Sequence, residues 1–380
     1  MISIAVLTGK RGGYGAMRPM LKIFEKSKII DLYIIATDQH LNKKFGFTIN
    51  EIKKDFKKII EVPIFQKSDS DLSRSTALGN CVIGLSKKLV EINPDYLMLY
   101  GDRGEVLAAA LVSTHLKIPI AHMQGGDISG NIDDGIRHAV SKLSHLHFVS
   151  NKNSFNRLRK MGEERWRIKN VGDSHIDPIL TRNKIVTKNF MKKYNITNDN
   201  KPIIALLHPE TIRKRDTFRD AKLMLECIKL YNRHTIIIYP CTDNGYEKII
   251  NAIKCFKNVN FFKVYKNIDS ADFIKLLSIS SLLIGNSSSG IIEAEYFNLP
   301  VINIGKRQLN RIRNKNVIDV DFNKLQVVKK IDYALNNKNF HKEIRRLKQL
   351  YGEGDTGLKI YNHLISSKYD KKKLLYKKFI

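Results

Sequence analysis

Short runs of aliphatic and β-branched residues alternate with longer stretches of helical pattern along almost the whole chain. This alternation is typical of βαβ units, in which parallel strands form a sheet that helices cover. A first series of strands is expected at residues 2–8, 32–37, 59–65, 96–101, 118–123 and 145–150. A second series is expected at residues 202–209, 234–240, 258–264, 281–286 and 300–305. The sequence therefore predicts an α/β fold built on doubly wound parallel sheets.

A polar segment rich in Asn and Lys, residues 181–201, separates the two series of strands. Changes of composition like this one mark connections between domains. The chain has 380 residues, 43% of them hydrophobic, which is enough for two cores. We therefore expect one domain over residues 1–180 and a second over residues 195–355. Ligands of such folds bind at the carboxyl ends of the strands, so we expect a cleft there and functional loops directly after strands.

The charge balance raises the question of polyanionic partners. The chain has 66 Lys and Arg residues against 37 Asp and Glu residues, a net charge of +29. Most of the excess is Lys dispersed among Ile and Asn, and no basic motif is interleaved with aromatic residues, so we expect no nucleic-acid partner. The basic tail at residues 368–379, KYDKKKLLYKKF, is interpreted either as a solvated terminus or as a weak contact with a membrane surface or an acidic partner.

Targeting signals and cysteine motifs are not evident. The longest apolar runs, such as IIDLYIIA, are much shorter than the roughly 18 to 20 residues of a membrane-spanning helix. The N-terminus MISIAVLTGKR has no basic n-region and no cleavage site, so we interpret it as a strand. The four cysteines form no C-x-x-C pair, which argues against a zinc site or a disulfide framework. These features predict a cytoplasmic protein.

Two loops of the first domain carry groups suited to a ligand. The loop TGKRGGYG at residues 8–15 combines glycines, Lys10 and Arg11 ahead of an expected helix, whose N-terminus favours an anion. It matches neither the G-x-G-x-x-G nor the Walker pattern, so a phosphate or sugar loop and a tight βα turn both remain open. Asp102 follows the fourth strand, where it could cap the next helix or take part in acid–base chemistry.

The densest group of polar residues is HMQGGDISGNIDDGIRH at residues 122–138. Loops this rich in glycine and charge usually approach a ligand. The clustered His and Asp residues raise the alternative of a metal site. No two of the histidines share the i, i+4 spacing that would direct both at one ion, so we expect no metal.

The second domain offers a matching set of loops. His208 ends its first strand and is either structural or a group that titrates near neutrality. The segment GNSSSGIIE at residues 285–293 follows a strand and opens a helix, so its N–H groups and hydroxyls can hold a diphosphate, while Glu293 can accept two hydrogen bonds from a ribose diol. An ordinary Ser-capped helix is the alternative. Further cations follow at Lys306, Arg307, Arg311 and Arg313.

Five long motifs occur in this order: LTGKRGGYG, YGDRGEVLAAA, GGDISGNIDDGIRHAVSKLSHLHF, LLHPET and IGNSSSGIIEAEYFNLPVINIGKRQ. Together they resemble the hydrolysing UDP-N-acetylglucosamine 2-epimerases of sialic acid and related nonulosonic acid biosynthesis, over about residues 1–365. The resemblance implies a glycosyltransferase-B-like fold of two Rossmann-like domains, with a helix in residues 356–380 that crosses back to the first. It also implies a nucleotide-sugar substrate, no cofactor and a homo-oligomer.

The resemblance assigns roles to individual residues. The catalytic residues it implies are Asp102, Gln124, Asp127, Asp133, Arg137 and His208. The nucleotide-sugar-binding residues it implies are Arg11, Tyr14, Arg103, Ser287, Ser288, Ser289, Gly290, Glu293, Arg307 and Arg311. The implied reaction removes the C2 proton and expels UDP to leave a 2-acetamidoglucal, after which water adds at C1 and a proton returns to the other face of C2. Two faces require two differently protonated groups.

The sequence departs from the family pattern at two positions. Gln124 stands where the family usually has Glu, and an amide cannot exchange a proton as a carboxyl group does. Gly13 stands where the first loop usually carries an acidic residue. Asp127 could substitute for Gln124, the enzyme could act on a differently decorated sugar, or the chain could bind nucleotide sugars without turnover. A non-hydrolysing epimerase and a sugar transferase of the same fold also stay open.

Overall fold

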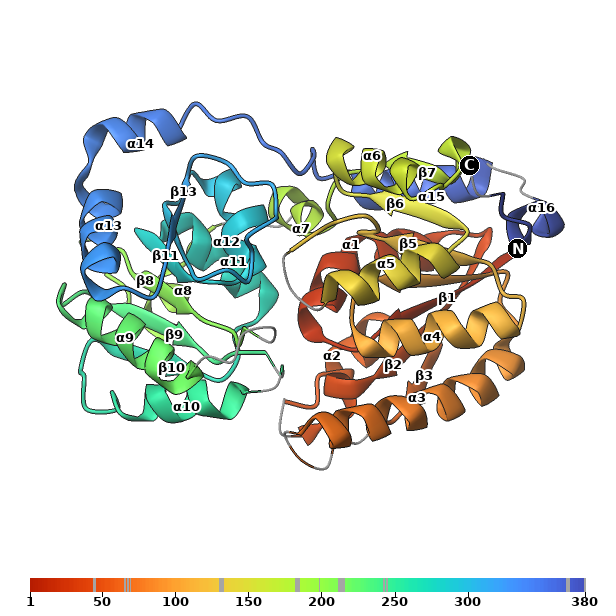
Figure 1. The fold of residues 1–380 in the computed structure, drawn as a ribbon, viewed down its shortest axis with the longest axis horizontal. Coiled ribbons are helices and arrows are strands. Elements are labelled where there is room, and N and C mark those ends of the chain that lie inside the picture. The colour runs from red at the N-terminus through yellow and green to blue at the C-terminus, as the bar shows by residue number, and fades with distance from the viewer. Residues whose placement is uncertain are drawn as a thin grey trace. The chain divides into compact units, whose positions relative to one another are not determined.

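The computed structural model describes residues 1–43, 46–64, 66, 68, 70–129, 133–181, 185–197, 199–210, 216–241, 243, 245–366 and 370–378. The chain forms two compact units, drawn in Figure 1. Unit 1 comprises Met1–Ile128, Ile132–Leu180 and Tyr351–Ile380, and unit 2 comprises Ser129–Asn131 and Thr181–Leu350. Five segments discussed above lie partly outside the described residues: the expected strand 59–65, the polar segment 181–201, the motif LLHPET, the loop 122–138 and the tail 368–379.

Unit 1 contains a seven-stranded parallel sheet in the order β3-β2-β1-β4-β5-β6-β7. Its strands are β1 (Ile2–Thr8), β2 (Ile30–Thr37), β3 (Ile59–Val62), β4 (Tyr96–Tyr100), β5 (Ile120–Met123), β6 (Leu146–Val149) and β7 (Ile168–Asn170). Its helices are α1 (Arg11–Lys26), η1 (Asp38–Leu41), α2 (Ile49–Asp55), α3 (Asp71–Ile92), α4 (Gly104–His115), α5 (Asp133–Leu143), α6 (Lys152–Lys160), η3 (Arg165–Arg167), α7 (Ile176–Thr181), α15 (Thr356–Ser366) and α16 (Lys371–Leu375).

Unit 2 contains a six-stranded parallel sheet in the order β10-β9-β8-β11-β12-β13. Its strands are β8 (Ile203–Leu206), β9 (Thr235–Ile238), β10 (Phe262–Tyr265), β11 (Leu282–Gly285), β12 (Val301–Ile304) and β13 (Val317–Val320). Its helices are α8 (Lys188–Lys193), α9 (Thr217–Lys229), α10 (Tyr246–Lys254), α11 (Ser270–Ile279), α12 (Ser288–Ile292), η4 (Ala294–Phe297), α13 (Lys324–Asn336) and α14 (Lys338–Ile344).

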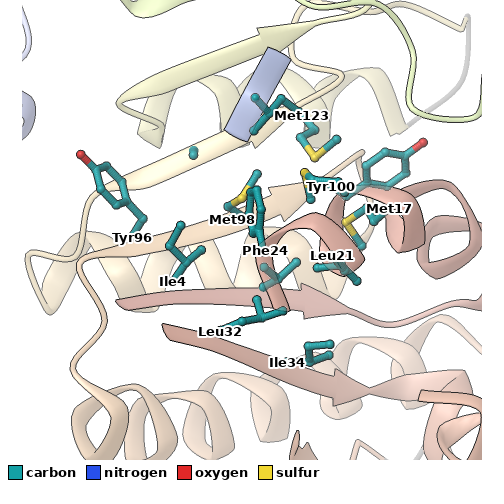
Figure 2. Packing of buried hydrophobic residues seen from close by; sticks show 14 of the residues in the cluster. Ile4, Met17, Leu21, Phe24, Leu32, Ile34, Tyr96, Met98, Tyr100 and Met123 are labelled. Atoms are coloured by element: carbon teal, nitrogen blue, oxygen red, sulfur yellow. The ribbon is translucent and has the colours of Figure 1, made fainter. Parts of the chain in front are cut away.

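The central strands are buried on both faces, as parallel strands between two helical layers must be. In β1, Ile4 faces one hydrophobic cluster and the next residue, Ala5, faces another, because successive side chains point to opposite faces of a sheet. Figure 2 shows the first of these clusters, in which Phe24 of α1 lies near Met98 of β4 and Met17 of α1 lies near Tyr100. This packing holds α1, and with it the loop that precedes it, against the sheet.

The strand order of each sheet reverses at one point, and the loops beside this point are favoured for ligand binding. In unit 1 the order reverses between β1 and β4, and in unit 2 between β8 and β11. Open α/β sheets bind ligands outside the carboxyl ends of the strands at this topological switch point. The loops that follow these four strands are therefore the ones that topology favours for a site.

The predicted fold class, two doubly wound parallel-sheet domains, is confirmed. The edge strands β7 and β13 are not among the predicted strands. They are short and only partly buried, so they carry no long apolar run. The expected strand 258–264 begins later, at Phe262, because a turn occupies the preceding residues. No helix in the described part of the chain is long and apolar enough to cross a membrane.

The C-terminal helix α15 belongs to unit 1, where Figure 1 shows it in blue beside α6 and β7. Ile360 and Leu364 are buried in the cluster of Figure 2. The N-terminal end of α15 is bound by Asp177, whose carboxylate accepts hydrogen bonds from the backbone N–H groups of Thr356 (3.0 Å) and Gly357 (2.7 Å). Unit 1 is thus completed by chain that follows unit 2 in sequence.

Gly357→Ala is expected to lower the free energy of unfolding by about 1–3 kcal/mol, the usual cost of overpacking. A Cβ at this position would lie 2.8 Å from the Cα of Met20 in α1, so one helix must move. Gly79→Ala in α3 is the matched control, since no atom lies within 4 Å of its Cβ and helix propensity then favours Ala. Urea denaturation of both variants measures the difference, and equal stability of the two would contradict this packing.

The basic tail is anchored to unit 1 over its described residues, although the side chains of Lys371, Lys372 and Lys373 stay exposed. The buried guanidinium of Arg167 donates to the backbone carbonyls of Leu374 (2.9 Å) and Tyr376 (2.8 Å). Lys377 pairs with the buried carboxylate of Glu163 at 2.7 Å. These contacts with Arg167 and Glu163 hold the described part of the tail in place.

Candidate active site

The loop after β1 is anchored by the first residues of α1. Arg11 pairs with Glu51 of α2 at 3.1 Å. Tyr14 is buried and donates its hydroxyl to Asp55 at 2.7 Å. Burial and the Asp55 carboxylate raise the pKa of Tyr14, so its phenol stays protonated. The structure therefore places Arg11 at the partly exposed start of the helix and Tyr14 beneath it as a support.

Arg103 lies in a cluster of ion pairs after β4. Its guanidinium contacts Asp38 at 3.0 Å and Glu105 at 2.7 Å, and Arg74 pairs with the same two carboxylates. Glu105 is buried, and although burial favours its neutral form, Arg103 and Arg74 lower its pKa. These contacts tie the loop after β4 to η1 and α3 and fix the backbone that presents Asp102.

Asp102 does not cap α4, which settles the first of its two interpretations. The N-cap position of α4 is Arg103, whose own side chain makes no capping hydrogen bond. Asp102 instead pairs with Arg137 of α5, whose side chain is 2% exposed. Arg137 also lies 3.7 Å from Asp134. The pair places one carboxylate and one guanidinium at the carboxyl edge of the sheet, next to its switch point.

Gln124 follows β5 in the left-handed region, with φ of 61°. Its Nε2 donates to the buried carboxylate of Asp173 at 2.8 Å, and its backbone N–H donates to the carbonyl of Phe148 at 3.0 Å. Asp127, the suggested substitute for Gln124, is buried and accepts hydrogen bonds from the hydroxyls of Ser150 (2.6 Å) and Ser154. The carboxylate that contacts Gln124 is therefore Asp173.

The pKa values of His122 and His138, the two histidines of the loop at 122–138, are lower than those of solvent-exposed histidines. His122 is fully buried between Gly101 and Ser141, and burial lowers its pKa to about 3. Burial and the charge of Arg137 also lower the pKa of His138. Both residues are neutral near pH 7. Among the described residues, no three His, Cys, Asp or Glu side chains gather so as to hold a metal ion.

In unit 2, Asn286 joins the two loops at the switch point. Its side-chain carbonyl accepts from the backbone N–H of His208 at 2.7 Å, and its amide donates to the carbonyl of His208 at 2.9 Å. The backbone N–H of Cys241 donates to Nδ1 of His208 at 2.9 Å. Because Nδ1 is an acceptor, neutral His208 carries its proton on Nε2, which can donate to an anionic oxygen but cannot accept a proton.

The Ser-rich turn after β11 lies at the carboxyl edge of the unit 2 sheet, as the loop of His208 does. Gly285 has φ of 145°, and a Cβ there would overlap the carbonyl of Leu206, so only glycine fits. Ser287 is the N-cap of α12 and accepts a hydrogen bond from Ser289 N–H at 3.4 Å. Ser288 and Ser289 are partly exposed, whereas Gly290 packs under Val301. Glu293 is buried directly after α12.

Arg307 approaches this turn from the loop after β12. Its guanidinium contacts the carbonyl of Asn286 at 3.4 Å and the carboxylate of Asp243 at 3.3 Å. Arg311 is placed by its backbone, which donates to Gln308. The structure thus brings His208, Ser287 and Arg307 together around Asn286, with a cation, hydroxyls and an N–H donor suited to a phosphate group.

Comparison with known proteins identifies the family of this chain. The sequence model of the family described as UDP-N-acetylglucosamine 2-epimerase matches residues 22–365. The chain belongs to the UDP-N-acetylglucosamine 2-epimerase family. A family member from Legionella pneumophila, named UDP-N,N'-diacetylbacillosamine 2-epimerase (hydrolyzing), is 36% identical over 95% of both chains. The GDP/UDP-N,N'-diacetylbacillosamine 2-epimerase (hydrolyzing) of Campylobacter jejuni is 33% identical over 85% of both chains.

A solved structure of the epimerase family shares the fold. The crystal structure of UDP-GlcNAc 2-epimerase from Neisseria meningitidis bound to UDP-GlcNAc superposes with a TM-score of 0.83, at 20% identity, over 97% of this chain and 100% of that one. At this identity the likeness supports the architecture alone. The roles of individual epimerase residues in this chain rest on its own geometry.

Sequence reasoning missed several groups that the structure places beside the expected ones. Asp173 and His175 lie in VGDSHID, after the unpredicted strand β7, and Tyr100 ends β4. The pairing of Asp with His two residues later was a usable signal. The sequence pattern predicts no strand at 168–170, so it does not bring that loop to the carboxyl edge. Asn286 lies within the Ser-rich motif, where the sequence alone gives it no separate role.

Proposed function

We propose that the protein is a hydrolysing UDP-sugar 2-epimerase that acts on UDP-N,N'-diacetylbacillosamine, a UDP-2,4-diacetamido-trideoxy-hexose, and releases UDP with the free 2-epimeric sugar. The observation that carries the proposal is the 36% identity, over 95% of both chains, to a relative of that name. UDP-GlcNAc is the second candidate substrate, because a Neisseria meningitidis relative named UDP-N-acetylglucosamine 2-epimerase is 30% identical over 94% of this chain.

The proposed reaction has two halves. In the first, a base removes the C2 proton, the C1–O bond breaks, and its electron pair leaves with UDP to give a 2-acetamidoglucal. In the second, the oxygen of water bonds to C1 and a proton is delivered to the opposite face of C2. The leaving group gains negative charge as the C1–O bond breaks, and preorganised donors stabilise such charge. His208 through Nε2–H, Ser287 and Arg307 are the proposed donors.

The groups proposed for the sugar are those of unit 1. Asp102 is held by Arg137 at the carboxyl edge of the sheet, beside the loop of Gln124. Asp133 opens α5 and lies one helical turn from Arg137. Arg11 and Arg103, each held by a carboxylate partner, place guanidinium groups close to the switch point. We assign proton transfer at the sugar to this unit and nucleotide binding chiefly to unit 2, including Ser288, Ser289, Glu293 and Arg311.

Glu293→Gln is expected to weaken UDP binding by about 10- to 100-fold, the range for losing a hydrogen bond to a charged acceptor. The carboxylate is buried after α12, where the amide would offer one acceptor oxygen in place of two. Isothermal titration with UDP measures the change. Glu343→Gln is the control, since Glu343 is an exposed partner of Lys315. Unaltered affinity in Glu293→Gln would remove this residue from the nucleotide site.

Proton NMR in deuterated water tests the proposed function with UDP-GlcNAc and UDP-N,N'-diacetylbacillosamine as alternative substrates. The expected result is free UDP with a C2-deuterated, 2-epimeric reducing sugar, formed faster from the diacetamido substrate. Epimerisation with UDP still attached would indicate the non-hydrolysing reaction. Binding without exchange at C2 or UDP release would indicate a nucleotide-sugar-binding protein.

Three further properties belong to this proposal. The product would feed nonulosonic acid and surface glycan biosynthesis, and the reaction would take place in the cytoplasm, where nucleotide sugars are made. A homo-oligomer is expected, and analytical ultracentrifugation measures it. Contact with a membrane surface can involve the exposed Lys371, Lys372 and Lys373, because Lys377 is occupied by Glu163.

A further inference from the structure

A carboxylate and a histidine form a pair beside Gln124 that the expected catalytic set does not include. Asp173 has no exposed side-chain surface, and its Oδ1 lies 2.8 Å from Nδ1 of His175. The same oxygen accepts the backbone N–H of His175 at 2.9 Å. The other oxygen of Asp173 accepts from Gln124. The imidazole of His175 is 21% exposed, so it is reachable from solvent while its carboxylate partner is not.

The pair lies at the same edge of the sheet as Asp102. The hydroxyl of Tyr100, the last residue of β4, is 2.9 Å from Nδ1 of His175. Gln124 follows β5, the neighbour of β4, and a Cβ on Gly101 would lie 3.8 Å from its Oε1. His175 therefore contacts the end of β4 directly through Tyr100, and it is linked to Gln124 after β5 through Asp173.

The contacts determine how His175 holds its protons. A carboxylate 2.8 Å from Nδ1 requires a proton on Nδ1, because two acceptors would repel each other at that distance. Although burial alone would raise the pKa of Asp173, the charge and hydrogen bonds of His175 lower it, so Asp173 stays ionised. Its negative charge stabilises the imidazolium form of His175. Asp177 is a further acidic group close enough to interact with Asp173.

Position 124 carries an amide, which cannot exchange a proton as a carboxyl group does, yet the proposed reaction needs a second proton-transfer group. We propose that His175, as an imidazolium held by Asp173, delivers the proton to C2 in the second half of the reaction, with Tyr100 and Gln124 as positioning residues. The inference rests on the proposed hydrolysing epimerase. It places at the Asp173–His175 pair the acid function that an amide at position 124 cannot perform.

The proposed step conserves atoms, electrons and charge. The C1=C2 electron pair of the 2-acetamidoglucal takes the proton from Nε2 of His175 and forms the C2–H bond. Water then bonds to C1 through its oxygen and gives up one proton, which returns to the neutral imidazole at Nε2. His175 is thereby restored, and no oxidant, reductant or metal is consumed.

His175→Asn is the decisive variant, with UDP release and sugar formation followed together by proton NMR in deuterated water. The expected result is continued UDP release with accumulation of the 2-acetamidoglucal, and sugar formation slower by about 10² to 10⁴-fold, the usual contribution of a general acid. Continued UDP release also shows that the variant is folded. His115→Asn, an exposed histidine at the end of α4, is the control and should retain the wild-type product ratio.

Asp173→Asn tests the positioning role through the pH profile of sugar formation. Without the carboxylate the imidazolium loses its stabilising charge, so the alkaline limb should move to lower pH, while UDP release changes less. A wild-type product ratio in His175→Asn, or an equal loss of UDP release and sugar formation, would overturn the inference. If wild-type protein releases no UDP from either substrate, it is the proposed function itself that fails.

Discussion

Asp102→Asn is expected to lower turnover by about 10² to 10⁴-fold while UDP binding is retained. Asp102 is paired with Arg137, which is buried, and lies next to the switch point of the unit 1 sheet. The amide keeps the shape of the side chain but can neither exchange a proton nor neutralise the guanidinium. The rate of UDP release by NMR, and UDP affinity by titration calorimetry, measure the two effects separately.

The control for this variant is Asp134→Asn. Asp134 is the second acidic neighbour of Arg137, at 3.7 Å, so its loss perturbs the same guanidinium without touching Asp102. We expect Asp134→Asn to retain turnover within about tenfold of wild type, since a one-sided loss of a longer ion pair is worth about 1 kcal/mol. Turnover of Asp102→Asn within tenfold of wild type would remove Asp102 from the chemistry.

Glu163→Gln is expected to lower the free energy of unfolding by about 3–5 kcal/mol at pH 7, the usual cost of breaking a buried ion pair from one side. Glu163 has no exposed side-chain surface and contacts Lys377 at 2.7 Å, His147 at 3.1 Å and Lys142 at 3.3 Å. Lys377 is itself 9% exposed and would be left without its carboxylate. The variant should therefore loosen the C-terminal tail as well as destabilise unit 1.

The effect of Glu163 depends on pH in a defined direction. Burial alone would raise its pKa, but the bonds to His147 and Lys377 lower it to about 2, from the ordinary value of 4.5. A lowered folded-state pKa contributes stability that is complete above the unfolded-state value and is lost as pH falls towards 2. Chemical denaturation at several pH values should show the gap between wild type and Glu163→Gln closing below about pH 4.5.

Glu91→Gln is the comparison for this second prediction. Glu91 pairs with Lys88 at 2.8 Å, but both side chains are exposed, so the expected loss is at most about 0.5 kcal/mol. If Glu91→Gln and Glu163→Gln lowered the free energy of unfolding equally, burial would not explain the contribution of the Glu163 ion pairs to stability. Limited proteolysis of the C-terminus gives an independent measure, since only the Glu163 variant should expose it.

The alternation of short apolar runs with helical segments was enough to predict the doubly wound sheets, because buried parallel strands read as continuous runs of β-branched residues. It did not predict β7 or β13, which are edge strands with fewer buried side chains. That omission had a consequence for the site. The loop with Asp173 and His175 follows β7, so its position at the carboxyl edge could not be inferred.

The sequence identifies candidate residues of the site, but it does not identify their hydrogen-bond partners. Gln124 was identified as a departure from the family pattern, but its partner lies 49 residues further along the chain. Likewise, the donor that assigns the proton of His208 to Nε2 is the backbone of Cys241, 33 residues away. A hydrogen bond between residues so far apart depends on the strand order and not on local spacing.

The sequence by itself determined the fold class and the family, because periodicity and contiguous motifs are local properties of the chain. The tertiary structure decided that Asp102 pairs with Arg137, that Asp173 holds Gln124 and His175, and that the basic tail is bound by Arg167 and Glu163. The physical reason is that a buried polar group needs a hydrogen-bond or ion-pair partner, and this partner determines its charge and orientation. The partner often lies far away in the sequence, so only the packing of the folded chain determines which residue it is.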